Sequence, residues 1–202
     1  MNLPIYFKKY GRYPSKCYWY NENDVFRHLC LIFAEANKKL IKDDYDLFVN
    51  DASETTVCAA LMHCLKTKLY MTPFNKYKVD IEYNRNFDRI KQIYSHDGLR
   101  TINCDLIVHS RGHSIWQDNL ISIEMKKEYR HEDEKQLDRE RLRALTRASY
   151  NNAWIFDGTE LPKYVCRYIL GIYYEIKQKD MLIEYYQKGN LIKTYSFPWR
   201  KQ

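Results

Sequence analysis

The chain has 202 residues, of which 45% are apolar, enough to bury the core of one globular domain but too few for two full domains. Its 33 Lys and Arg against 26 Asp and Glu give a net charge of +7, which favours a polyanionic partner. Only six Gly and five Pro, beside 19 Tyr, eight Phe and four Trp, exclude collagen-like, disordered and low-complexity classes.

The cysteines indicate a reduced protein. There are six of them, and none forms a Cys-x-x-Cys pair, so a disulfide framework is not expected. Cys58, His63 and Cys64 resemble half of a zinc site, but no second pair at ligand spacing follows them. No signal peptide or membrane-spanning apolar segment is visible. We therefore expect a cytoplasmic protein with no membrane partner.

The first 50 residues form an arm and a helix in this interpretation. Residues 1–20 are rich in Tyr and Lys without a clean period, and their aromatic side chains must pack on another surface. From Asp24, apolar residues recur at spacings of three and four, which predicts a helix that ends near Asp43. The many tyrosines also leave room for a homo-oligomer or a protein partner.

A helix and three strands are predicted next. The Asp51-x-x-Glu54 spacing fits a capping box that begins a helix running through Leu69. Apolar and charged residues then alternate over 77–83, which predicts a strand, and weaker and stronger alternation predicts strands at 102–109 and 119–127. The segment 110–118 has the length of a hairpin connection, so the last two strands should be antiparallel neighbours.

The second half of the chain is predicted to be a helix followed by strands. Residues 131–147 suit an amphipathic helix with Leu137, Arg141, Ala144, Leu145 and Ala148 on one face. Asn152 to Phe156 then suits a buried strand, reached by a right-handed parallel crossover. An antiparallel meander should follow, with strands at 165–176, 181–187 and 191–197. We predict one α/β (α+β) domain with a core over 51–157 and a β extension over 158–202.

The most informative residues are Asp105, Glu124 and Lys126. Glu124 and Lys126 share one strand face because side chains alternate with period two. If the hairpin closes symmetrically, with Val108 opposite Ile121, then Asp105 lies opposite Glu124, with Cβ atoms about 5 Å apart. Carboxylates so close need a cation between them, and hard oxygen ligands suit Mg²⁺ or Mn²⁺. Lys126 would then stand beside an attacking water and the charge that develops on a phosphate.

These residues resemble the core of the PD-(D/E)XK nuclease superfamily, restriction-endonuclease-like proteins. The resemblance covers about residues 51–157, and the segments 79–85 and 107–112 are similar to small uncharacterised bacterial and phage members. It implies an αβββαβ core with a mixed sheet, a divalent-metal site on Asp105, Glu124 and the backbone carbonyl of Met125, and Lys126 as the catalytic lysine. Cys104 replaces the proline that often precedes the aspartate, and because proline is not a ligand the change should be tolerated.

Other charged residues have two interpretations each. Members of the superfamily commonly add a glutamate from the first core helix, a role open to Glu54, although a capping box would also explain that residue. On the charged helix Lys135, Arg139, Arg143 and Arg147 form a row that could follow a phosphate backbone, but the interspersed acids favour an internally paired face exposed to solvent. Phosphate contacts are also plausible for Arg85 and Arg111, at strand ends, whereas His109 suits a hydrogen-bonding role better than that of a base.

The primary hypothesis is a metal-dependent nuclease, an enzyme that hydrolyses phosphodiester bonds by in-line attack of a metal-activated water, with DNA as the expected substrate. A second hypothesis keeps the nuclease fold but uses the β extension and the aromatic arm to bind nucleic acid or another protein. A third is a phage or mobile-element accessory protein whose nuclease domain stays inactive until a partner arrives. The alternative to the nuclease-like interpretation is that Asp105, Glu124 and Lys126 form an ordinary solvated sheet face or a ladder of salt bridges.

Overall fold

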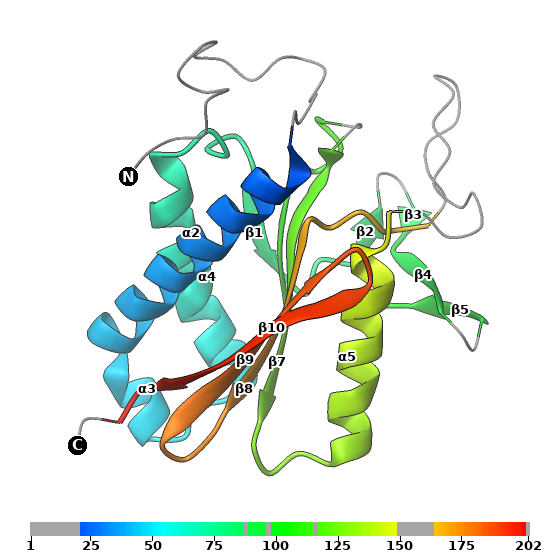
Figure 1. The fold of residues 1–202 in the computed structure, drawn as a ribbon. Helices are drawn as coiled ribbons and strands as arrows, with labels where there is room; N and C mark the ends of the chain where they lie inside the picture. The colour runs from blue at the N-terminus through cyan, green and yellow to red at the C-terminus, as the bar shows by residue number, and fades with distance from the viewer. Residues whose placement is uncertain (1–20, 87–88, 96–97, 115–116, 149–163, 201–202) are drawn as a thin grey trace, which may run out of the picture.

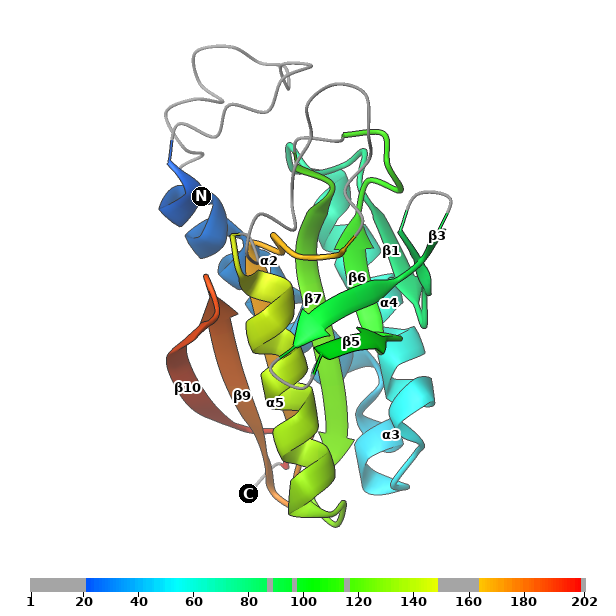
Figure 2. The same ribbon diagram turned by 90° about the vertical axis from the view of Figure 1, so that its right-hand side faces the viewer.

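A six-stranded sheet lies between two layers of helices (Figure 1). The computed structural model describes residues 21–86, 89–95, 98–114, 117–148 and 164–200. Helices α2 and α4 cover one face of the sheet, and α5 covers the other (Figure 1). The short ribbon β4–β5 packs beside α5 on that second face (Figure 2). In the described part of the chain, no helix combines the length and apolar character needed to cross a membrane.

The predicted helices and strands that fall on described residues occur in the predicted order, but a short helix over 45–49 and four short strands over 85–101 were not predicted. The helices are α2 (Glu22–Asp43), α3 (Tyr45–Val49), α4 (Glu54–Tyr70) and α5 (Glu132–Thr146). Across the main sheet the strands are β1 (Lys78–Ile81), β6 (Leu106–His109), β7 (Asn119–Lys127), β8 (Leu170–Ile176), β9 (Asp180–Gln187) and β10 (Asn190–Pro198). Two small ribbons pair β2 (Arg85–Asn86) with β3 (Arg89–Ile90) and β4 (Gln92–Ser95) with β5 (Gly98–Thr101). The mixed α/β class predicted from the sequence is confirmed.

The predicted hairpin has the predicted register. β6 and β7 are antiparallel neighbours, with Leu106 opposite Ile123 and Val108 opposite Ile121. The register shifts by one residue after Val108, so that His109 lies opposite Asn119. β6 itself is only four residues long and begins later than the expected strand over 102–109, immediately after Asp105. The full length of β7 matches the prediction.

The parallel strand comes later in the chain than predicted. β8 lies parallel to β7, and β8, β9 and β10 then form the expected antiparallel meander. The segment 152–156, predicted to be the parallel strand, and the arm over 1–20 lie outside the described residues. Among the described strands β8 therefore completes the strand–helix–strand crossover, which places it beside β7 at the centre of the sheet.

The beginning of α4 differs from the prediction of a capping box. The N-cap is Ser53, whose Oγ accepts a hydrogen bond from the backbone N–H of Thr56 at 3.2 Å. Asp51 adopts a left-handed backbone (φ 51°) and forms an ion pair with Lys127, and the Glu54 carboxylate accepts from the backbone of β7. A serine hydroxyl satisfies the exposed helix amides well, which leaves Glu54 available to the sheet.

The face that α5 presents to the sheet agrees with the prediction only in part. Ala144 and Leu145 are buried as predicted, but Leu137 is 44% exposed, and the helix also buries Lys135, Asp138, Leu142 and Thr146. The helix is rotated relative to the predicted face because the sheet beneath it carries acidic side chains. Its cations pair with those acids instead of facing solvent, and the contact between α5 and the sheet is partly polar.

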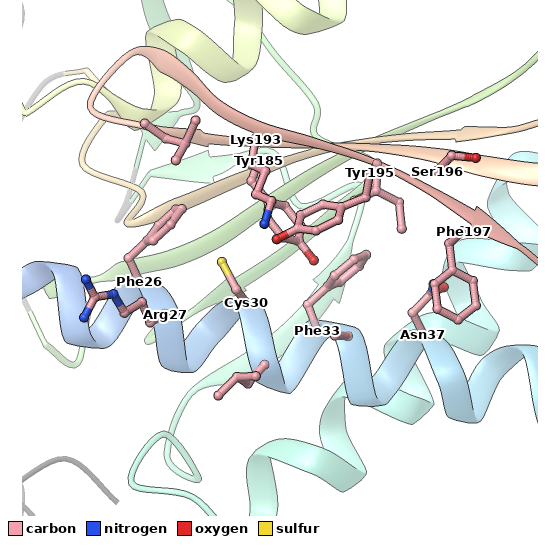
Figure 3. A pocket seen from close by; sticks show the side chains of 14 residues that line it. Phe26, Arg27, Cys30, Phe33, Asn37, Tyr185, Lys193, Tyr195, Ser196 and Phe197 are labelled. Atoms are coloured by element: carbon pink, nitrogen blue, oxygen red, sulfur yellow. The ribbon is translucent and has the colours of Figure 1, made fainter.

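Most of the described cysteines lie in the protein interior. In the described part of the chain, Cys58, Cys64, Cys104 and Cys166 are buried and free, and Cys30 is half-buried and free. Cys30 also lines an apolar groove of about 480 Å³ between α2 and the β9–β10 hairpin, together with Phe26, Phe33, Tyr185 and Tyr195, as drawn in Figure 3.

Gly171 sets the distance between α5 and β8. A Cβ built on this residue would lie 2.8 Å from Cγ2 of Thr146 and 3.2 Å from Cβ of Tyr186. We expect Gly171→Ala to lower the free energy of unfolding by about 2 kcal/mol, because overpacking forces neighbouring groups apart. Urea denaturation followed by circular dichroism measures this change.

The control for this prediction removes the clashing methyl group. Thr146→Ser keeps the hydroxyl that donates to the carbonyl of Leu142 and accepts from the N–H of Gly189, but it lacks Cγ2. In the Thr146→Ser background, Gly171→Ala should therefore cost less than half as much as in the wild type. Equal costs in the two backgrounds would show that this contact does not set the spacing.

Candidate active site

Two carboxylates accept hydrogen bonds from the part of β7 that extends past Leu106, the first residue of β6. The ladder between the strands stops at Leu106 and Ile123, although β7 continues to Lys127. Beyond that point the backbone N–H of Met125 donates to Asp105 Oδ2 at 2.7 Å, and the N–H of Lys127 donates to Glu54 Oε1 at 2.9 Å. Because a buried backbone amide needs an acceptor, these carboxylates take the place of the missing strand.

Glu124 is the most buried acid of the site. Its side chain has no exposed surface, and its Oε2 accepts a hydrogen bond from Nη1 of Arg141 at 2.9 Å. Among the described residues its Oε1 has no hydrogen-bond partner. Burial raises the pKa of Glu124 well above its ordinary value, and the nearby charge of Asp105 adds to this effect while Arg141 opposes it.

Lys126 lies on the same face of β7 as Glu124 and forms an ion pair with α5. Its Nζ is 2.8 Å from Oδ2 of Asp138 and 3.5 Å from the carbonyl oxygen of Met125. Burial lowers the pKa of Lys126, but its ion pair with Asp138 and the charges of Asp105 and Glu54 outweigh burial and raise it. The side chain is therefore a half-buried ammonium group.

The structure brings the predicted site residues into one electrostatic environment. Burial raises the pKa of Asp105, and the Met125 amide and Lys126 oppose that rise. Burial is the main reason that the pKa of the Cys58 thiol is raised. The negative charges of Asp105, Glu124 and Glu54 raise it further, and the positive charge of Lys126 lowers it. Asp105 does not face Glu124 in the strand ladder as predicted; its side chain instead accepts a hydrogen bond from the N–H of Met125, the residue after Glu124.

Two residues of the site, Asp138 and Arg141, came from outside the sequence-based prediction of the site. They lie one turn apart on α5, with Nη1 of Arg141 3.3 Å from Oδ1 of Asp138. Asp138 pairs with Lys126, and Arg141 pairs with Glu124. A signal for Arg141 was present, since it fell on the face of the helix predicted to be buried, where a charge needs a partner. Asp138 carried no such signal, because it is one of many acids on a charged helix.

The basic row of α5 faces the sheet. Lys135 is buried, with its Nζ 2.9 Å from Oε1 of Glu175. Arg139 pairs with Glu184 at 3.1 Å, and its guanidinium lies 4.1 Å above the Tyr173 ring. These contacts match neither interpretation, because both cations pair with acids of the sheet and do not belong to a solvent-facing helix surface, and neither Lys135 nor Arg139 is available to a phosphate backbone.

The other predicted phosphate contacts lie on different parts of the molecule. Arg85 is exposed on the small ribbon β2–β3. Arg111 donates from Nε to Asp80 Oδ2 at 2.8 Å, and His109 Nε2 is 2.9 Å from the same oxygen. His109 therefore has the hydrogen-bonding role expected of it, at the end of β6 opposite to Asp105.

The donor set suits a hard divalent cation. Asp105, Glu124 and the Met125 carbonyl offer oxygen ligands of the kind that Mg²⁺ and Mn²⁺ prefer, and the buried Oε1 of Glu124 lacks a partner among the described residues. In that part of the chain no three His, Cys, Asp or Glu side chains already converge as a metal cluster. The reason is visible in the contacts: Glu124 is turned to Arg141, and Asp105 to the Met125 amide.

Comparisons with protein families, characterised proteins and solved structures gave no significant match. The chemistry of these side chains is therefore the basis on which a function is assigned.

Arg141 compensates the charge of the buried Glu124 carboxylate. The effect of an Arg141 substitution on the free energy of unfolding should therefore depend on pH. Arg141→Gln should lower the free energy of unfolding by about 3 kcal/mol at about pH 8, because it leaves an unpaired carboxylate in the interior. The folded-state pKa of Glu124 already lies above its unfolded value, so stability is lost as pH rises through that pKa. The loss caused by Arg141→Gln should therefore be smaller at about pH 5 than at about pH 8, because lower pH favours the neutral form of Glu124, whose pKa burial raises.

Urea denaturation of wild type and variant at both pH values measures this effect. The control is Arg141→Gln combined with Glu124→Gln, which removes the stranded charge and should recover most of the lost stability at about pH 8. A loss of the same size at both pH values would contradict an electrostatic cause.

Proposed function

We propose that the protein is a divalent-metal-dependent nuclease of the PD-(D/E)XK type that hydrolyses phosphodiester bonds, with DNA as its substrate. The observation that carries the proposal is that Asp105 and Glu54 accept hydrogen bonds from the backbone N–H groups of Met125 and Lys127, on either side of Lys126 and beside the buried Glu124. A surface ladder of charges would lie in solvent and would have no reason to bury Glu124 completely.

The order of the elements supports the same proposal. In chain order α4, β1, β6, β7, α5 and β8 follow one another as helix, three strands, helix, strand, the order implied by the resemblance. The first three of these strands pair antiparallel in sequence, and the last is parallel to β7. This order, with two small ribbons inserted between β1 and β6, supports a restriction-endonuclease-like core.

Each side chain has a role that follows from its position. Asp105, Glu124 and the Met125 carbonyl would hold a Mg²⁺ or Mn²⁺ ion, which when bound supplies Lewis-acid polarisation of a phosphate and acidifies a water. Lys126 is held as an ammonium beside the Met125 carbonyl, where it can donate to a phosphate oxygen or to the attacking water. Glu54, fixed by the Lys127 amide and by Arg130, can orient that water.

Lys126 provides the decisive test. Linear, supercoiled and single-stranded DNA, and RNA, are incubated with the purified protein and Mg²⁺, Mn²⁺ or EDTA, and products are resolved on gels. Lys126→Ala should reduce metal-dependent cleavage at least about 100-fold, because it removes the cation that stabilises developing charge. The control is Lys66→Ala, which removes an exposed lysine of α4 and should leave cleavage unchanged. Cleavage that survives Lys126→Ala would contradict this assignment.

A second candidate is a nuclease-fold protein that binds nucleic acid or a protein and is silent or requires an activating partner. The observation that favours it is the engagement of Glu124 with Arg141 and of Lys126 with Asp138. This candidate predicts DNA affinity that is the same in EDTA and in Mg²⁺ and is insensitive to Glu124→Ala. Fluorescence anisotropy with labelled DNA measures that affinity, and absence of cleavage in every condition above would favour this candidate.

A further inference from the structure

Arg141 occupies the position on Glu124 where a cation is needed. Its Nη1 lies 2.9 Å from Oε2 of Glu124, whose side chain is fully buried. Arg141 projects from α5, whereas Lys126, from the same strand as Glu124, pairs with Asp138. A buried carboxylate that keeps its charge needs a compensating cation, and the guanidinium of Arg141 supplies one.

We infer that Arg141 is an internal counter-cation that competes with the divalent metal ion for Glu124. This inference rests on the proposed function. Only one oxygen of Glu124 is engaged, since Oε1 has no partner among the described residues. A divalent ion that approached Glu124 would meet the positive charge of Arg141 at the same carboxylate, and in a buried environment the repulsion between two cations is weakly screened. The two cations therefore oppose each other's binding.

The structure offers Arg141 an alternative partner. Its Nη1 is also 3.3 Å from Oδ1 of Asp138 and 3.5 Å from the carbonyl oxygen of Asn103. A guanidinium that moves away from Glu124 is therefore not stranded without an acceptor, because Asp138 remains within reach. Asp138 thus contacts both cations of the site, Lys126 through one oxygen and Arg141 through the other.

Substitution of Arg141 should consequently strengthen metal binding. The probe is Mn²⁺ alone, and free Mn²⁺ is quantified by electron paramagnetic resonance during titration of the full chain without nucleic acid. Arg141→Gln should lower the Kd for Mn²⁺ about tenfold, within the usual range of coupling between two ligands. Arg141→Lys keeps one positive charge on a shorter side chain and should lower the Kd about threefold, and it decides the question if the Gln variant does not fold.

Two control variants locate the effect. Arg143→Gln removes a neighbouring cation that donates to the carbonyl of Gly189 and lies over the Tyr186 ring, and it should leave the Kd unchanged. Glu124→Gln should weaken Mn²⁺ binding in the wild type and in both Arg141 variants.

The outcomes separate this inference from the proposed function. Binding that depends on Glu124 but is no tighter in the Arg141 variants overturns the competition and leaves the metal site intact. Binding that is weak in every chain and indifferent to Glu124→Gln overturns the metal site and the proposed function together. Equal tightening in Arg143→Gln would reveal a general charge effect and would also overturn the competition.

Discussion

The unequal lengths of β6 and β7 create the site. β7 has nine residues and β6 has four, so the second half of β7 continues beyond its antiparallel neighbour. The amides of that half still require acceptors, and the chain supplies Asp105 from the residue before β6 and Glu54 from the first turn of α4. The same hydrogen bonds that complete the sheet therefore collect carboxylates at one place.

A polar layer between α5 and the sheet is the second constraint. Three glutamates of the sheet form ion pairs with cations of α5: Glu124 with Arg141, Glu175 with Lys135, and Glu184 with Arg139. Such buried pairs contribute little net stability compared with apolar packing, because both charges lose their hydration. Their geometry is instead specific, and it sets the rotation of α5 on the sheet. The apolar core on the opposite face, formed by α2, α4 and the sheet, supplies most of the stability.

Patterns with a short period were sufficient to predict the sheet around the site. Strict alternation located β7, and symmetric closure of the hairpin predicted the pairing of Val108 with Ile121. The residues that escaped prediction depend on tertiary contacts. Asp138 resembles any acid of a charged helix in the sequence, and its role depends on its contact with Lys126. Ser53 is the N-cap of α4, and Asp51 pairs with Lys127 instead. Helix rotation was mispredicted for the same reason, since the acids beneath α5 come from strands distant in sequence.

The contact between Glu124 and Arg141 bears on both candidate functions. A site of clustered carboxylates is costly without a cation, since like charges repel and burial removes their hydration. Arg141 lowers that cost in the protein alone, which is why Glu124 can be completely buried on β7 without disrupting the core. Under the proposed function, a divalent metal ion displaces the guanidinium from Glu124. Under the second candidate function, the guanidinium stays on Glu124 and the ion pair stabilises the fold without catalysis. The chemical difference between an enzyme and a silent scaffold is then the exchange of partners at one carboxylate.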